Sequence, residues 1–147
     1  MKDDQLRIKY YLQVETDLTA LTTVLEWLEK FALPLVPDRL WFDCELILTE
    51  GFTNAVRHAH KHLPPTTPID LELKVFANSL EILIWDRGQP FNLEEKLQFI
   101  LKHPSNPLER EGWRGLLLMK KLTNELSYIR TPDDRNCLVM RKSIINC

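Results

Sequence analysis

The stretch ELILTEGFTNAVRHAHKH, Glu45 to His62, decides the fold and carries the first chemical signal. Glu50 and Asn54 are four residues apart, so in a helix their side chains lie one turn apart on one face. Mg²⁺ takes oxygen ligands and keeps most of its waters, so one Asn oxygen together with substrate phosphates can hold it. Glu50 would then be free to act as a base. Two solvated residues on an ordinary amphipathic helix would give the same spacing.

The composition indicates an ordinary globular chain, and we expect one domain over residues 1–147. With 27% charged residues and a net charge of −2, electrostatics favours neither nucleic acid nor membrane as a partner. Cys44, Cys137 and Cys147 form no CxxC pair, so no disulfide framework or zinc site is expected. The N-terminus lacks an apolar signal segment and no apolar run is long enough to span a membrane, so we expect a cytoplasmic protein.

The first half of the chain predicts a strand followed by two helices. Residues 6–14 are rich in aromatic and β-branched side chains, and residues 20–31 have helical character after the cap candidates Thr16 and Asp17. The second helix opens at Pro37-Asp38, and LPPTTP at residues 63–68 ends it. Its apolar stripe recurs every three to four residues and predicts packing on a sheet; the stripe is Leu40, Cys44, Leu48, Phe52 and Ala55.

The second half predicts four further strands around a long irregular segment. Residues 69–76 and 80–85 read as an antiparallel hairpin. Residues 87–114 contain three prolines and one short helical patch near 94–101, which is typical of a functional lid. A helix over 116–122 and strands over 126–130 and 137–144 follow. We therefore expect an α/β two-layer sandwich (α+β), with helices on one face of a mixed, mainly antiparallel sheet.

Two further motifs complete the candidate site. Asp86 is expected at a strand end and is followed by Gly88, so its carboxylate can accept a hydrogen bond from an exocyclic amine. The run Arg110 to Gly115 is expected at the start of a helix, where backbone N–H groups and the helix dipole favour phosphate. Together with Glu50 and Asn54, these motifs specify an adenine nucleotide.

The three motifs in this order resemble a known family. E-x-x-x-N, D-x-G-x-P-F and E-R-x-G-x-x-G-L-x-L-M are similar to the N, G1 and G2 boxes of the Bergerat-fold (GHKL) ATPases, which include gyrase, Hsp90, histidine kinases and MutL. The resemblance covers about residues 6–144. Because the chain is short and shows no phosphoacceptor helix, it is most similar to the RsbW-type anti-sigma factor serine/threonine kinases.

The resemblance implies roles for the residues around the phosphates. Glu50 matches the catalytic base, and Asn54 matches the ligand that binds Mg²⁺ through its amide oxygen. Arg110 matches a basic residue that can reach the terminal phosphate and stabilise the transition state. His58 matches a family histidine that packs beside the ligands.

The resemblance also assigns the nucleotide-binding residues. Asp86 matches the aspartate that reads the adenine amino group, and Gly88 matches the glycine that lets the backbone approach the base. Gly112 and Gly115 match the glycines of the phosphate-facing lid and helix start.

Two departures from the family pattern affect the base site. Gln89-Pro90 replaces a second G1 glycine and should stiffen the loop. Asn136 and Cys137 stand where the family has a Gly-Thr pair whose hydroxyl supports the aspartate, and a thiol is a weaker partner.

The function implied is an ATP- and Mg²⁺-dependent serine/threonine kinase that phosphorylates an anti-anti-sigma (STAS-type) protein and alternately binds a sigma factor. The resemblance also allows a homodimer, with no direct contact to nucleic acid or membrane. The alternatives are a nucleotide-responsive binding module without phosphoryl transfer and, less favoured, a histidine-kinase fragment. His58, His60 and His62 cannot all face one metal from a regular helix, so we expect two of them to be solvated.

Overall fold

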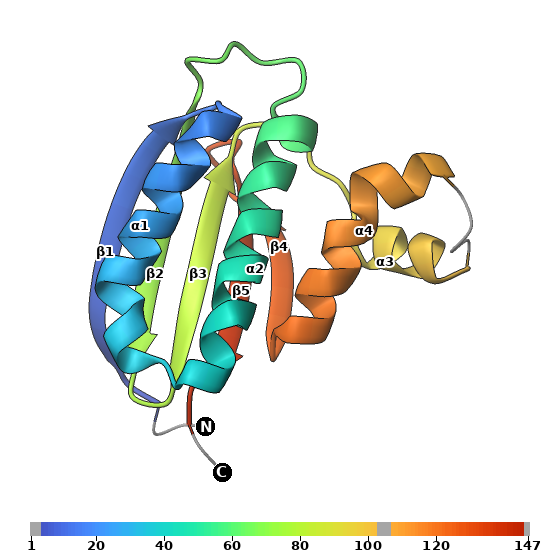
Figure 1. Ribbon diagram of the computed structural model, residues 1–147. Coiled ribbons are helices and arrows are strands. Elements are labelled where there is room, and N and C mark those ends of the chain that lie inside the picture. The colour runs from blue at the N-terminus through green and yellow to red at the C-terminus, as the bar shows by residue number, and fades with distance from the viewer. Residues whose placement is uncertain (1–3, 103–106, 146–147) are drawn as a thin grey trace.

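The computed structural model describes residues 4–102 and 107–145, with the backbone alone for residues 107–113. One sheet forms the back layer, and helices cover a single face of it (Figure 1). The two-layer α/β sandwich is therefore confirmed. No helix in the described ranges is long and apolar enough to cross a membrane.

The sheet has five strands in the order β1-β2-β3-β5-β4. Their bounds are β1 (Leu6–Glu15), β2 (Pro68–Phe76), β3 (Ser79–Asp86), β4 (Glu125–Arg130) and β5 (Asn136–Ser143). We expected a mixed, mainly antiparallel sheet, but each of the four described strand pairs is antiparallel. The reason is that β2-β3 and β4-β5 are hairpins, and the second hairpin enters the sheet with β5 beside β3.

The helices are α1 (Leu21–Ala32), α2 (Asp38–Asn54), α3 (Leu93–Lys102) and α4 (Pro107–Leu122). In Figure 1, α1 and α2 lie on one face of the sheet, α4 lies beside α2, and α3 lies against α4. The predicted stripe on α2 is confirmed, because Cys44, Leu48 and Phe52 are fully buried. At Gly51 an added Cβ would lie 2.7 Å from Ile84 Cδ1, so the last turn of α2 packs directly on β3.

The long helix changes geometry immediately after Asn54. Residues Ala55–Ala59 form a π-helical turn, which the backbone N–H of His60 closes by donating to the Ala55 carbonyl at 2.9 Å. Such widened turns often occur at functional sites. Here the turn lies beside the end of β3, which carries Asp86.

The segment predicted as an irregular lid is largely helical. Within residues 87–114 we expected only a short helical patch, whereas the chain forms α3 and begins α4 at Pro107. Proline suits a first helical turn because the missing N–H would have no partner there. Gly112 and Gly115 consequently lie inside α4 and not at its start. The burial of Leu116 and Met119 outweighs the roughly 1 kcal/mol that each helical glycine costs.

Candidate functional site

A cavity of about 490 Å³ opens between the C-terminal end of α2, the sheet, and helices α3 and α4. It is large enough for a small organic ligand. Residues from every neighbouring element line it, among them Asn54, His58, Asp86, Phe91, Leu116 and Tyr128. The fold therefore brings the predicted Asn54 and Asp86 to one cavity from α2 and β3.

Glu50 takes a different direction from Asn54. It is absent from the cavity lining, and its carboxylate lies against α4, where a Cβ added to Gly115 would be 2.3 Å from Glu50 Oε1. Gly51, which follows Glu50, and Leu116, which follows Gly115, both line the cavity, so Glu50 lies next to the cavity. The absence of a side chain at Gly115 leaves the space that the carboxylate occupies.

Asp86 is buried, with 4% of its surface exposed, and three groups hold its carboxylate. Oδ1 accepts hydrogen bonds from the Gly88 backbone N–H at 2.9 Å and from Asn136 Nδ2 at 2.8 Å. Oδ2 accepts from the Tyr128 hydroxyl at 3.0 Å. Because all three partners donate, the carboxylate acts as an acceptor that is fixed in one orientation.

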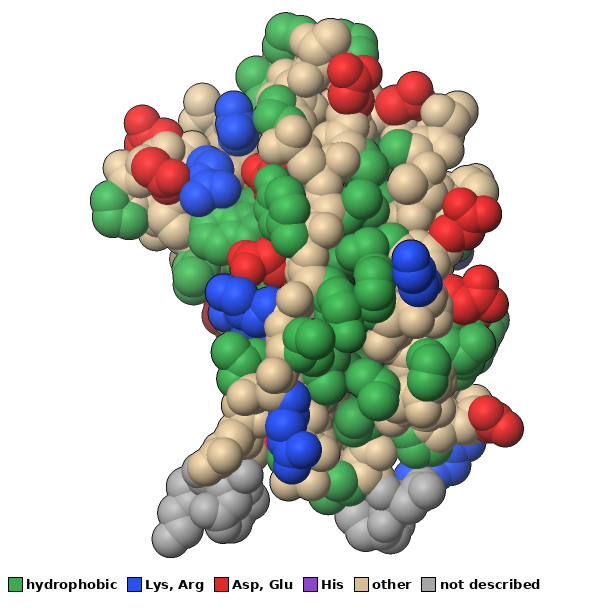
Figure 2. All heavy atoms as spheres, turned by 90° about the vertical axis from the view of Figure 1, so that its left-hand side faces the viewer, with side chains coloured by type: hydrophobic (Ala, Val, Ile, Leu, Met, Phe, Trp, Pro, Cys, Tyr) green, Lys and Arg blue, Asp and Glu red, His purple; other side chains and the backbone are tan. Residues whose placement is uncertain are grey.

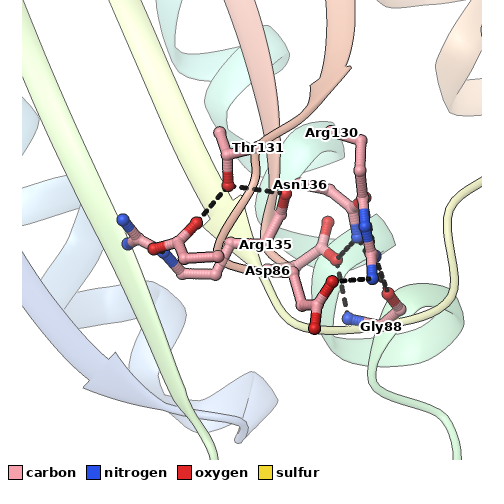
Figure 3. Close-up of polar contacts among 8 residues, drawn as sticks. Asp86, Gly88, Arg130, Thr131, Arg135 and Asn136 are labelled. Carbon is pink, nitrogen blue, oxygen red and sulfur yellow. Dashed lines mark hydrogen bonds and ion pairs between the residues drawn. The ribbon is translucent and has the colours of Figure 1, made fainter.

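The turn after Asp86 is fixed by the same network (Figure 3). The Gly88 carbonyl accepts from Asn136 Nδ2 at 2.9 Å and from Arg130 Nη1 at 3.1 Å. On its other side Gly88 packs against the π-helical turn, where an added Cβ would lie 2.0 Å from the Ala59 carbonyl oxygen. Only glycine fits at this close approach of two backbones.

Asn136 corrects one expectation about this site. We expected the thiol of Cys137 to replace the family hydroxyl beside Asp86, but the carboxamide of Asn136 does so. The two residues are neighbours on β5 and so face opposite sides of the sheet. Cys137 is buried, with its Sγ 3.9 Å from the Leu138 carbonyl. The support for Asp86 is therefore a full hydrogen bond.

His60 is buried beside the turn, which corrects the expectation that two of the three histidines are solvated. Its Nε2 accepts from the Arg87 backbone N–H at 2.8 Å, and its Nδ1 lies 2.8 Å from Thr16 Oγ1. The Thr16 hydroxyl donates to the Thr67 carbonyl at 2.6 Å, so Nδ1 carries the proton and the ring is neutral. Burial lowers the pKa of His60 in agreement with this. His62 is exposed, whereas His58 is partly buried in the cavity wall.

Cationic side chains at the cavity were missed by sequence reasoning. Lys61 and Lys96 line it together with His58, whose pKa is lowered by burial and then by Arg57 and Lys61. Lys96 also makes a further interaction within the protein. No motif marks either lysine, because the sheet and α3 must assemble before the lysines lie near Asn54. Tyr128 was missed too, although strand alternation alone would have placed it on the helix-covered face.

The donor set agrees with Mg²⁺ that is held mainly by phosphates. Among the described residues, no group of three or more His, Cys, Asp or Glu side chains could hold a metal. The carboxamide side chains of Asn54 and Gln89 line the cavity, and Mg²⁺ is commonly bound by one or two protein groups plus substrate phosphates. The side chain of Arg110 and the surroundings of Gly112 lie outside the described residues.

Comparison with known proteins agrees with this geometry. The histidine kinase-like ATPase domain matches residues 14–142. The chain is similar to proteins named serine-protein kinase RsbW: 34% identical in Oceanobacillus iheyensis and 32% in Bacillus subtilis, in each case over 57% of this chain and 54% of the relative. A Bacillus licheniformis protein of the same name is 30% identical over 71% of this chain and 64% of the relative.

The matches to these relatives span between about half and two thirds of their length. The family match, in contrast, runs from the end of β1 to β5 and includes the whole cavity. This chain therefore belongs to the family of histidine kinase-like ATPase domains.

Proposed function

We propose that this protein is an ATP-dependent serine/threonine kinase that acts as an anti-sigma factor in bacterial partner switching. The observation that carries the proposal is the cavity that joins Asn54 of α2 to Asp86 of β3, with Glu50 one helical turn before Asn54. The names of the similar proteins support the same reading. The substrate would be an anti-anti-sigma protein of the STAS type, and a sigma factor would be the alternative partner.

Each site residue then has a distinct task. Asp86 accepts a hydrogen bond from the adenine amino group, and Asn54 holds Mg²⁺ through its amide oxygen. ATP supplies the phosphoryl group, and Mg²⁺ neutralises charge on its phosphates. Glu50 accepts the proton of the attacking serine hydroxyl, for which its carboxylate must turn from Gly115 toward the cavity.

The remaining assignments complete the site. Arg110 stabilises charge at the terminal phosphate. Gly112 and Gly115 belong to the part of α4 that faces the phosphates, and Gly88 keeps the base-binding turn close to the π-helical turn. We further propose that the protein acts in the cytoplasm as a single domain, with residues 87–114 as its lid and without direct contact to nucleic acid or membrane.

A homodimer is also part of the proposal. β1 is the end strand of the described sheet, so one of its edges is open. Leu6, Ile8 and Tyr11 on this strand are 49%, 44% and 61% exposed. Figure 2 shows hydrophobic side chains gathered on the side of the molecule where β1 lies. Sedimentation of the purified protein tests this part, and a monomer at micromolar concentration would contradict it.

The proposed activity is tested by calorimetric titration with ATP and ADP, with and without Mg²⁺, and by phosphate transfer to a cognate STAS-type protein. Asp86→Asn should abolish adenine selectivity because its amide also presents donors. Asn54→Ala should remove the Mg²⁺ enhancement while the melting temperature without nucleotide stays within a few degrees. Glu50→Gln should keep nucleotide binding and lose transfer. Transfer at the native rate in Glu50→Gln would overturn the assignment.

One observation favours a second candidate, a nucleotide-responsive binding module without phosphoryl transfer. The carboxylate of Glu50 lies against α4 and outside the cavity lining, and α4 is helical across Gly112 and Gly115. In this arrangement Glu50 is not placed to accept a proton from a substrate in the cavity. For this candidate we expect tight ATP binding, no transfer to any cognate STAS-type protein, and unchanged partner affinity in Glu50→Gln.

A further inference from the structure

The hydroxyl of Tyr128 lies at the corner of the cavity where Asp86 is found. Both residues line the cavity, Tyr128 from β4 and Asp86 from the end of β3. The hydroxyl donates its hydrogen to Asp86 Oδ2 at 3.0 Å. A phenol has one hydrogen to donate, so the Tyr128 oxygen presents only lone pairs to a ligand.

The Asp86 carboxylate has little acceptor capacity left. Oδ1 already accepts from the Gly88 N–H and from Asn136 Nδ2, which uses both of its lone pairs. Among the described residues Oδ2 accepts from Tyr128 alone, which leaves it one lone pair. The corner therefore offers two adjacent acceptors, Asp86 Oδ2 and Tyr128 Oη, and no donor from this pair.

The Tyr128 hydroxyl is fixed in position and in protonation. Its ring stacks on Phe91 with the centroids 4.4 Å apart and an interplanar angle of 24°, and Phe91 also lines the cavity. Burial and the nearby charge of Asp86 raise the pKa of Tyr128 well above its ordinary value. The hydroxyl therefore keeps its proton and continues to donate it to Asp86 throughout the physiological pH range.

We propose that Tyr128 is a specificity-determining residue that reads the exocyclic amino group of a 6-aminopurine together with Asp86. An amino group has two N–H donors, which match two acceptors. A 6-oxopurine in the same pose would place a carbonyl lone pair against both acceptors. The inference rests on the proposed function, since it assumes that this cavity binds an adenine nucleotide.

The test compares ATP with inosine triphosphate, which carries a 6-oxo group in place of the amino group, by calorimetry. Tyr128→Phe keeps the stacked ring and removes the acceptor. We expect ATP affinity to fall about 3- to 10-fold, the effect of one hydrogen bond, while the affinity for inosine triphosphate stays the same or rises because one of the two repelling acceptors is gone. Tyr11→Phe is the matched control, because the Tyr11 hydroxyl also donates to a buried aspartate, Asp70, whose side chain lies outside the cavity lining.

A second measurement on the native protein does not depend on the folding of a variant. N6-methyl-ATP keeps one N–H, so we expect it to bind 3- to 10-fold more weakly than ATP. That difference should shrink in Tyr128→Phe.

The outcomes separate this inference from the proposed function. If the native protein binds ATP and Tyr128→Phe keeps the same ratio of ATP to inosine triphosphate affinity, the role of Tyr128 is wrong while the function stands. If Tyr128→Phe binds ATP more tightly, the hydroxyl competes with the base for Asp86, which also overturns the inference. If the folded native protein binds neither ATP nor ADP, both proposals fail.

Discussion

Asn136 is the residue on which the orientation of Asp86 most depends. Its Nδ2 group donates to Asp86 Oδ1 and to the Gly88 carbonyl, while its Oδ1 accepts from Arg130 Nη1 at 3.3 Å. The side chain is fully buried. A single amide thus links β5 and β4 to the turn that follows β3.

We predict that Asn136→Ala lowers the free energy of unfolding by about 1–3 kcal/mol, because two buried acceptors, Asp86 Oδ1 and the Gly88 carbonyl, each lose one of their donors. Urea unfolding measures this loss. The control is Asn124→Ala, which removes an amide oxygen that accepts from the Ser143 N–H at an exposed position. It should cost no more than about 1 kcal/mol. Equal losses in the two variants would contradict the role of Asn136.

His60 gives the stability a predictable pH dependence. Burial lowers its pKa below the ordinary 6.5; the charge of Arg87 acts in the same direction and that of Asp86 in the opposite one. Well above pH 6.5 the ring is neutral in both the folded and the unfolded state. As the pH falls, the unfolded chain takes up the proton first, so stability falls until the folded pKa is reached.

We predict a loss of up to about 1.4 kcal/mol per pH unit from His60 below pH 6.5, measured by urea unfolding between pH 7.5 and 5.5. His58 has the same sign, because its pKa is also lowered. His60→Asn should flatten the slope, whereas His62→Asn, at an exposed position, should leave it unchanged. If the free energy of unfolding of His60→Asn changes with pH as steeply as that of the native protein, His60 is not held neutral in the folded state.

At the scale of the elements, the contact between α2 and α4 determines where Glu50 points. The contact is close because Gly115 has no side chain, and the carboxylate of Glu50 lies in the space that results. The contact between α2 and the sheet is also close at Gly51, but there an added Cβ would meet the apolar side chains of Ile84 on β3 and of Met140 and Leu138 on β5. These two glycines allow a matched comparison.

We predict that Gly115→Ala lowers phosphate transfer at least 10-fold, because the added methyl group crowds the Glu50 side chain and fills the space through which its carboxylate turns toward the cavity. The melting temperature should change by only a few degrees. Alanine favours the helix by about 1 kcal/mol, and the end of a flexible Glu side chain can move. Gly51→Ala should instead lower stability by about 1–3 kcal/mol, since its methyl meets a packed core. Thermal melts and transfer assays measure both effects. Native transfer by Gly115→Ala would contradict the role of this contact.

At the scale of the whole molecule, two buried thiols lie on opposite sides of the sheet. Cys44 is on α2, and Cys137 is on the face of β5 turned away from the helices. Both are free, and burial raises the pKa of Cys44 to about 11 and that of Cys137 to about 12. The side chain of Cys147 lies outside the described residues.

We predict that neither Cys44 nor Cys137 reacts with iodoacetamide at pH 8 until the protein unfolds, because access and thiolate formation are both suppressed. Mass spectrometry of peptides labelled at increasing urea concentration should give one midpoint for both thiols, equal to that of global unfolding. Labelling of Cys137 well before Cys44 would show that the sheet opens before the helical layer separates.

The elements could largely be predicted because local pattern decides them. Alternation marked β1 and the β2-β3 hairpin, and the stripe through Cys44 and Phe52 marked the buried face of α2. The three motifs also placed Asn54 and Asp86 at one site. The predicted start of α4 was wrong. Two glycines and a preceding run with two prolines indicated an irregular segment, whereas packing of the later turns of α4 extends the helix back to Pro107.

The sequence by itself determined the family, the layers and which residues could carry the chemistry, because helical and strand periodicities and motif spacings are local properties of the chain. Only the tertiary structure decided how the site is held. Tyr128 and Asn136 reach Asp86 from 42 and 50 residues away, because the sheet order places β5 beside β3 and β4 next to β5. The directions of Glu50 and His60 likewise depend on α4 and on the ends of β1 and β3. Such contacts form between segments distant in sequence, so no local pattern encodes them.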